Sequence, residues 1–149
     1  MLLPLTLGAG ACQPSANSPV EAQAPSGLEQ IPLTVRTAAG RSHRLTVEVA
    51  QTPEQQATGL MNRQSLAPDH GMIFPYDPPR DASFWMKNTL IPLDIIFIRP
   101  DRTVARIAAQ TVPLSLDPVS SLEPISAVLE IGGGRAAELG IQPGDRVAW

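Results

Sequence analysis

Lys87, Asn88 and Asp94 interrupt a mostly apolar segment, "SFWMKNTLIPLDIIFI", at residues 83–98. Lys87 is the only lysine in the 149-residue chain, and apart from two histidines every other basic residue is an arginine. An ammonium group is compact and its pKa shifts readily on burial, whereas a guanidinium presents a fixed fork of donors. A single lysine in an arginine-rich chain therefore indicates a position where this difference matters.

Two carboxylates interrupt apolar strands in the same way. Asp94 lies within "LDIIFI", which is apolar on both faces, and Glu130 lies within "AVLEI". A buried carboxylate needs a cation or several N–H donors. This leaves two interpretations: a structural network in which Asp94 accepts hydrogen bonds from the preceding loop, or a pocket for a ligand with anionic or hydroxyl groups. The candidate ligand-binding residues are Lys87, Asn88, Asp94, Glu130 and Arg63.

The same segment also fits two other classes of function. A hydrolase-type enzyme could use Asp94 or Glu130 as acid or base, with Lys87 as an electrostatic stabiliser. A protein-interaction scaffold could instead use the aromatic segment from Phe74 to Trp85 as an exposed docking surface. A turnover assay separates the enzyme from both binding functions.

Other motifs indicate metal or phosphate binding more weakly. Met61, Met72, Met86 and His70 offer ligand types that suit Cu(I), although methionine is also a common core residue. "EIGGGRAAEL" places a Gly-rich turn before a short helix, a geometry that binds phosphate, but it lacks the lysine of a P-loop. With two histidines and one cysteine, the chain shows neither a zinc nor a serine-triad signature. We therefore expect no metal and no cofactor.

The first 27 residues differ in composition from the rest of the chain. Residues 1–11 contain a leucine-rich segment and then small residues, the pattern of an export signal cleaved before Cys12. "AGAC" resembles the bacterial lipoprotein signal, which predicts acylation of Cys12 and a membrane anchor. Residues 12–27 are predicted to be a disordered Pro/Ser/Ala linker. We expect a periplasmic lipoprotein; the alternative is a disordered tail with an incidental cysteine.

Residues 28–149 are predicted to form a single globular domain. "LTVRT" and "LTVEV" alternate with period two around a turn and predict an antiparallel hairpin. "TPEQQATGLMNR" predicts a helix of two to three turns with a capping box at Thr52, and "RAAELG" a second short one. Further strands are expected on both sides of the breaker "DPPRD" and in "LDIIFIR", "TVARIAAQTV", "ISAVLEI" and "RVAW". The fold is expected to be mainly β (α+β): a small antiparallel, barrel-like sheet of six to eight short strands.

Charge and hydropathy narrow the range of partners. The formal net charge is -3 at pH 7 and no run of basic residues is present, which argues against nucleic acid. No apolar run approaches the ~20 residues that span a bilayer as a helix.

Five motifs resemble, in order and spacing, those of the family called domain of unknown function 192. They are "GLMNR" (59–63), "GMIF" (71–74), "FWMKNTLIPLDIIFI" (84–98), "VLEI" (128–131) and "GIQPGD" (140–145). The resemblance extends from about residue 31 to the C-terminus, and it implies a small, often exported β-rich domain of bacteria or archaea without an established activity. Together with the leader, it favours a membrane-tethered module that binds a small polar, saccharide-like ligand or another envelope component.

Overall fold

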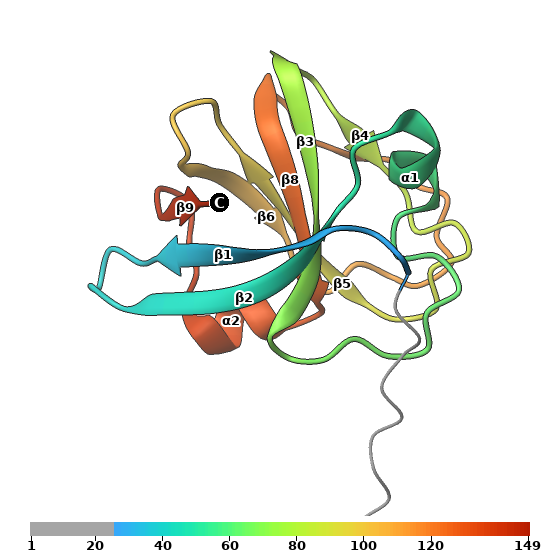
Figure 1. Cartoon of the computed structure of the whole chain (residues 1–149), viewed down its shortest axis with the longest axis horizontal. Helices are drawn as coiled ribbons and strands as arrows, with labels where there is room; N and C mark the ends of the chain where they lie inside the picture. Colours follow the sequence, from blue (N-terminus) through green and yellow to red (C-terminus); the bar gives the residue numbers. More distant parts are fainter. Residues whose placement is uncertain (1–25) are drawn as a thin grey trace, which may run out of the picture.

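The computed structural model describes residues 26–149, which form one curled, mainly β domain (Figure 1). The predicted leader, Cys12 and the linker up to residue 25 lie outside the described residues. Within the described range, no helix is long and apolar enough to cross a membrane. The predicted mainly β fold with two short helices is confirmed.

The described residues form a main sheet of seven strands and a separate pair of short strands. In spatial order the main sheet contains β6 (Val104–Ala108), β5 (Leu93–Ile98), β8 (Ile125–Gly132), β3 (His70–Arg80), β2 (Ser42–Val49), β1 (Gln30–Arg36) and β9 (Arg146–Ala148). The separate pair is β4 (Ser83–Phe84) and β7 (Val119–Ser120), and the helices are α1 (Pro53–Thr58) and α2 (Arg135–Leu139).

The predicted antiparallel sheet is mixed, because one pair of its strands is parallel. β2 and β3 run parallel, with Glu48 beside Met72, while the other neighbours in the main sheet are antiparallel. Parallel neighbours require a crossover connection, and residues 50–69, which include α1, supply it. The crossover places α1 against β3, where Gln56 donates to the Pro75 carbonyl.

Helix α1 begins where it was predicted to begin, but it ends earlier than predicted. Thr52 accepts from the Gln55 amide and the Gln55 side chain accepts from the Thr52 amide, which completes the capping box. The helix stops at Thr58 because Gly59 adopts φ 48° and ψ -132°, which is not helical. The Gly59 backbone also passes close to Phe74, whose ring carbon would lie 3.4 Å from an added Cβ.

Strand β3 also differs from the prediction. It extends through "DPPRD" as far as Arg80, with a cis peptide bond between Asp77 and Pro78. Its pairing with β8 is irregular between Pro75 and Arg80, so the prolines fall where ladder hydrogen bonds are interrupted.

A hydrophobic cluster lies on each face of the main sheet. The first includes Leu33, Val35, Leu45, Val47, Ile96, Leu129 and Ile131, and the second includes Leu60, Met72, Phe74, Met86, Ile95, Phe97 and Val128. All six residues of β5 are buried, which confirms that this strand is apolar on both faces. The second cluster faces α1 and the candidate site.

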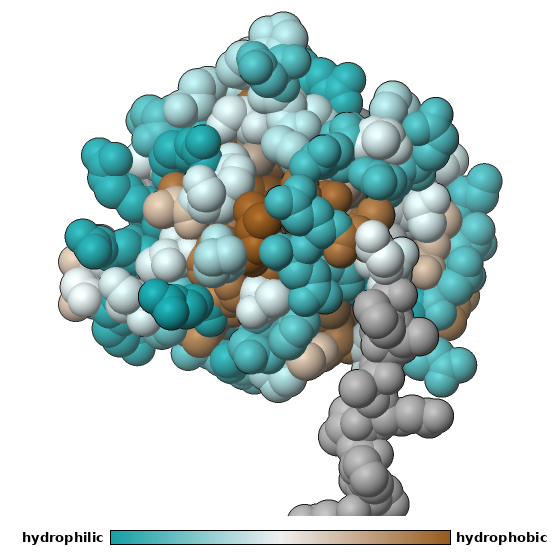
Figure 2. Space-filling view, in the orientation of Figure 1, coloured by the Kyte–Doolittle hydropathy of each residue, from teal (hydrophilic) through white to brown (hydrophobic). Residues whose placement is uncertain are grey.

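The two ends of the strand order approach one another. Thr103 bridges Arg146, and the Val147 amide donates to the Arg102 carbonyl. These contacts join the start of β6 to β9 and curl the sheet into a half-barrel (Figure 1). Figure 2 shows hydrophobic residues near the middle of one face of the molecule, surrounded by hydrophilic ones.

Candidate functional site

Two hollows adjoin helix α1. The larger, here called the α1 cleft, has a volume of about 360 Å³ and is lined by Ser26, Leu28, Glu54, Gln55, Thr58, Gly59, Met61 and Arg63. The smaller, here called the Glu130 cavity, has a volume of about 40 Å³ and is lined by Gln56, Ala57, Thr58, Gly59, Leu60, Met61, Phe74, Phe84, Trp85, Thr89 and Glu130. Thr58, Gly59 and Met61 border both, so the two hollows are neighbours.

Glu130 is a buried acid without a partner. It lies on β8 between Met72 of β3 and Ile95 of β5, and it is only 5% exposed. Its carboxyl makes no hydrogen bond or ion pair with another described residue. It is not wholly shut off from solvent, because within residues 26–149 the fully buried side-chain atom without a partner is His43 Nε2. Burial raises the pKa of the Glu130 carboxyl to about 8, so the group is mostly protonated at neutral pH.

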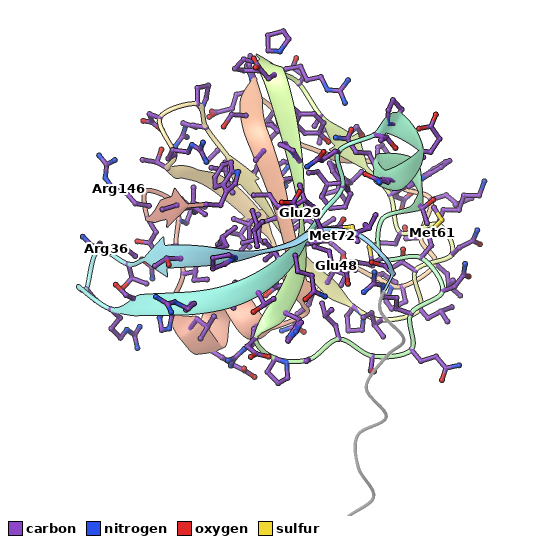
Figure 3. All side chains as sticks on the ribbon, in the orientation of Figure 1. Glu29, Arg36, Glu48, Met61, Met72 and Arg146 are labelled. Atoms are coloured by element: carbon purple, nitrogen blue, oxygen red, sulfur yellow. The ribbon has the colours of Figure 1, made fainter. Side chains whose placement is uncertain are left out.

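Glu48 lies on the same sheet face but has partners. It sits on β2 on the other side of Met72 from Glu130. Arg63 donates to both of its oxygens at 2.6 Å, and the Ser26 hydroxyl donates at 2.5 Å. Burial acts to raise the pKa of Glu48, but these bonds and the positive charges nearby outweigh it and lower the pKa. Figure 3 shows Glu48 and Met72 close together beside β2 and β3, and Met61 below α1.

Lys87 and Asn88 lie at the surface beside the Glu130 cavity. The Lys87 Nζ lies 5.0 Å from the ring centroid of Trp85, a cavity-lining residue that is 49% exposed. Asn88 has φ 54°, and its carbonyl accepts from the Asn62 amide. Both residues lie in the chain close to cavity-lining residues but do not line the cavity themselves. Neither contacts Asp94 or Glu130 through a hydrogen bond or ion pair within residues 26–149.

Asp94 organises α2. One carboxylate oxygen accepts from the amides of Gln110 at 2.8 Å and Gly134 at 2.9 Å, and the other accepts from Ala136 at 2.7 Å. The structural interpretation of Asp94 is therefore correct in kind, although its donors come from later loops than the one predicted. The predicted phosphate-binding turn of "EIGGGRAAEL" already holds this carboxylate at its amides, so it does not present a free anion site.

Asp94 and Glu130 do not share a pocket. In the sheet Asp94 is paired with Ile131 and Ile95 with Glu130, and paired residues project to the same face. Asp94 therefore faces the first hydrophobic cluster, with Ile131, and Glu130 faces the second, with Ile95. The predicted convergence of Lys87, Asn88, Asp94 and Glu130 is corrected accordingly: Glu130 lines the cavity beside α1, Asp94 faces the other side of the sheet, and Arg63 lines the adjoining cleft.

The methionines and the aromatic segment mostly serve packing. Met72 and Met86 are buried in the second cluster, while the His70 ring is bound to Asp69 at 2.8 Å. No group of three His, Cys, Asp or Glu side chains with metal-binding geometry occurs in residues 26–149. The docking surface predicted from Phe74 to Trp85 is also wrong in part: of its aromatic side chains, Phe74 is buried, Tyr76 and Phe84 are half-buried, and only Trp85 is exposed.

Apart from Arg63 and Glu130, the residues that line the two hollows were not predicted as ligand-binding from the sequence. Phe84 and Trp85 belong to a quoted motif, but nothing in that motif places them beside Gln56 and Thr58 of α1. The available sign in the sequence was that Gly59 and Phe74 both lie in motifs shared with the family, "GLMNR" and "GMIF". The contact between them depends on the parallel crossover, which local periodicity does not reveal.

Comparison with known proteins gives a family and a fold. The family model for domain of unknown function 192, described as an uncharacterised ACR, matches residues 34–149. No curated protein matches the chain. A crystal structure from Sinorhizobium meliloti 1021, provisionally described as a transcription regulator, is 42% identical with a TM-score of 0.81, covering 84% of this chain and 97% of that one. A protein of unknown function from Novosphingobium aromaticivorans DSM 12444 is 46% identical with a TM-score of 0.81, covering 94% and 100%.

Proposed function

This chain belongs to the domain of unknown function 192 family, and we propose that it is a binding module that takes a small polar, saccharide-like ligand of the cell envelope beside α1. In this proposal Cys12 carries a lipid that holds the module outside the cytoplasm, as the leader predicts. The net charge of -3 does not favour DNA as the partner of this chain.

One observation carries the proposal: Glu130 lies buried and unpartnered on the wall of a cavity. An acid kept in such a place lowers stability, because the group loses its hydration and gains no internal bond. Polar groups that break local packing rules in this way are typical of functional sites. A ligand that hydrogen-bonds to Glu130 would compensate the lost hydration only in the bound state.

The adjoining α1 cleft has the dimensions of a ligand site. Its volume of about 360 Å³ falls in the range of small-molecule pockets, roughly 300–1,000 Å³. Leu28 and Met61 give it apolar walls, and Ser26 and Thr58 contribute hydroxyls. Arg63 uses two of its nitrogens to bind Glu48, which fixes its guanidinium at the wall of the cleft. Apolar faces with fixed polar groups suit a sugar.

Calorimetry against envelope saccharides and short peptides tests this function. We expect at least one saccharide to bind the wild-type chain and to lose about tenfold or more in affinity, near 1.4 kcal/mol, with Glu130→Gln or Met61→Ala. Glu138→Gln, an exposed change on α2, serves as the matched control and should leave affinity unchanged. Absence of binding across the panel, or binding that neither cavity variant weakens, would contradict the proposal.

A second candidate function is an enzyme with Glu130 as general acid. The raised pKa of Glu130 keeps its proton available at neutral pH, as a general acid requires. Lys87 does not reach Glu130 within the described residues, so its predicted role as electrostatic stabiliser would need a ligand between them. Turnover of any bound saccharide that falls as pH rises past about 8, and is lost in Glu130→Gln, would favour this function over simple binding.

A further inference from the structure

No described residue donates a hydrogen bond to the Glu130 carboxyl, although burial and then the charge of Glu130 raise the pKa of the nearby Tyr76 phenol. The polar side chains that line the Glu130 cavity are already engaged: Gln56 donates to Ala50 and Pro75, Thr58 to Glu54, and Thr89 to Lys87. The neighbouring backbone amides belong to the β3–β8–β5 ladder. The carboxyl is therefore open to a complementary group that a ligand would bring.

The cavity also lacks a positive charge. The nearest cations in the described chain make other contacts: Arg63 is bound to Glu48, and Arg80 lies 4.3 Å from the Tyr76 ring centroid. Lys87 lies 5.0 Å from the ring centroid of the cavity-lining Trp85, outside the cavity, and no described cation contributes to the pKa of Glu130. An ionised Glu130 would therefore be uncompensated. A ligand that brought a cation would supply both the missing charge and the missing donors.

The other walls of the cavity are aromatic. Phe74, Phe84 and Trp85 line it, and the first two rings pack edge to face with centroids 5.1 Å apart. Aromatic rings with an adjacent carboxylate are the surroundings that attract organic cations. Met61 adds a polarizable thioether where the cavity meets the α1 cleft.

The chemistry of the cavity favours one kind of cation. Its volume of about 40 Å³ exceeds the ~10–15 Å³ that one water needs on the same measure, so a small head group has room. A terminal –NH₃⁺ group can donate hydrogen bonds to the carboxyl, whereas a trimethylammonium group has no N–H to donate. The rest of such a ligand would extend past Thr58 and Met61 into the α1 cleft.

We infer that the Glu130 cavity is a subsite for the primary ammonium group of the ligand, with Glu130 as its counter-ion and Phe74, Phe84 and Trp85 as its aromatic walls. The inference rests on the proposed function and narrows its ligand to an amine-bearing one. When R–NH₃⁺ enters a site whose Glu130 is protonated, the carboxyl proton passes to solvent and the ion pair remains. No covalent bond changes.

Simple four-carbon probes test the subsite without knowledge of the natural ligand. Butylammonium, 1-butanol, butyrate and butyltrimethylammonium would each be titrated into the ¹⁵N-labelled full chain, and binding would be followed through the backbone amide signals of residues 56–61 and 128–131. We expect butylammonium to bind at least tenfold more tightly than the other three. Butanol or butyltrimethylammonium binding as tightly as butylammonium would overturn the inference, as would the absence of any butylammonium effect.

Two variants complete the test. Glu130→Gln keeps the shape of the side chain, and we expect it to weaken butylammonium at least tenfold while the thermal melt shows a folded protein. Glu138→Gln removes an exposed carboxylate from α2, outside both hollows, and should change affinity less than twofold. Equal losses in both variants would mean general attraction of cations and would overturn the subsite.

The outcomes for the two proposals are separable. Neutral saccharides that bind while butylammonium does not would leave the proposed function standing and end the amine subsite. Butylammonium that binds through Glu130 while the saccharide panel fails would support the subsite and reject a saccharide as the ligand.

Discussion

Two buried glutamates on one sheet face show how hydrogen-bonding partners decide the state of a carboxyl. Glu48 and Glu130 flank Met72 on neighbouring strands. Glu48 receives two bonds from Arg63 and one from Ser26, and its pKa is lowered. Glu130 receives none from residues 26–149, and burial raises its pKa to about 8. The contrast makes Glu130 the residue to test first.

Replacing Glu130 by Gln should stabilise the protein at alkaline pH. The folded-state pKa of about 8 lies above the ordinary value of 4.5, so the unfolded chain releases its proton first as pH rises. The ionisation of the native Glu130 therefore does not lower the free energy of unfolding below about pH 4.5. It lowers this free energy increasingly between pH 4.5 and 8, and by a constant amount above pH 8. Measured by urea unfolding, the stability of Glu130→Gln relative to the wild type should be roughly 1–4 kcal/mol higher at pH 8.5 than at pH 4. A gain that is independent of pH would contradict the raised pKa.

The corresponding change at Glu48 should act in the opposite direction. Glu48→Gln leaves the Arg63 guanidinium, whose side chain is 14% exposed, without its counter-ion, and we expect a loss of roughly 1–3 kcal/mol at pH 7. Because the folded pKa of Glu48 is lowered, the stabilising effect of the wild-type carboxylate is present above about pH 4.5 and disappears as pH falls through the folded value. Urea unfolding at pH 7 and pH 3 measures both quantities, and equal losses at the two pH values would contradict the ion pair.

Asp94 should matter for stability independently of Lys87. Asp94→Ala removes the acceptor of three amides and should cost roughly 2–4 kcal/mol. Lys87→Met should change little, since Lys87 is exposed and its recorded contact is with Trp85. A double-mutant cycle should therefore give a coupling below roughly 0.5 kcal/mol. A larger coupling would indicate a link between the two residues that the described geometry lacks.

Part of this residue-scale picture was predictable from the sequence. Polar residues inside apolar strands correctly marked Asp94 and Glu130 as buried. Their faces were not predictable, because period-two alternation fixes relative positions within one strand and not the register between β5 and β8. The ion pair of Arg63 with Glu48 was missed for a similar reason, since it spans the crossover between β2 and β3.

At the scale of elements, α1 and its exit define the walls of both hollows. The capping box at Thr52 was readable from "TPEQ" because capping is local chemistry. The end of the helix was not, because Gly59 leaves the helix in a conformation selected by its packing against Phe74. The parallel pairing of β2 with β3 also escaped prediction, as periodicity does not give strand direction.

Gly59→Ala tests how far α1 depends on this exit. At φ 48° and ψ -132° a side chain is strained, and an added Cβ would contact the Phe74 ring at 3.4 Å. We expect a loss of more than about 1 kcal/mol and a change in the amide signals of residues 56–61. Thr52→Ala, at the other end of the helix, should cost about 1 kcal/mol through the lost cap. A neutral Gly59→Ala would show that the exit relaxes freely.

At the scale of the whole molecule, residues 26–149 contain the complete half-barrel together with α1. Seven strands and the contacts between β6 and β9 lie within the described range. Deleting residues 1–25 should therefore leave the urea midpoint unchanged, and a lowered midpoint would show that the segment contributes to folding. The mainly β architecture itself followed from alternation and turn residues, while its curl depends on distant contacts such as Thr103 with Arg146.

The predicted lipid anchor at Cys12 also concerns the whole molecule. Mass spectrometry of the protein from its native membrane should show cleavage before Cys12 and an acylated cysteine. An intact Met1 would contradict export. A soluble, unacylated Cys12 terminus would contradict only the lipid.

The ionisation of Glu130 is the most direct test of the central claim, that a buried, partnerless carboxyl lines a cavity beside α1. The measurement is a ¹³C NMR titration of the labelled glutamate carboxyl groups from pH 3 to 10, with Glu130→Gln used to assign the signal. The structure predicts a Glu130 pKa of about 8. A value near the ordinary 4.5 would mean that the carboxyl is hydrated or paired in solution, and the ligand site built around it would then be rejected.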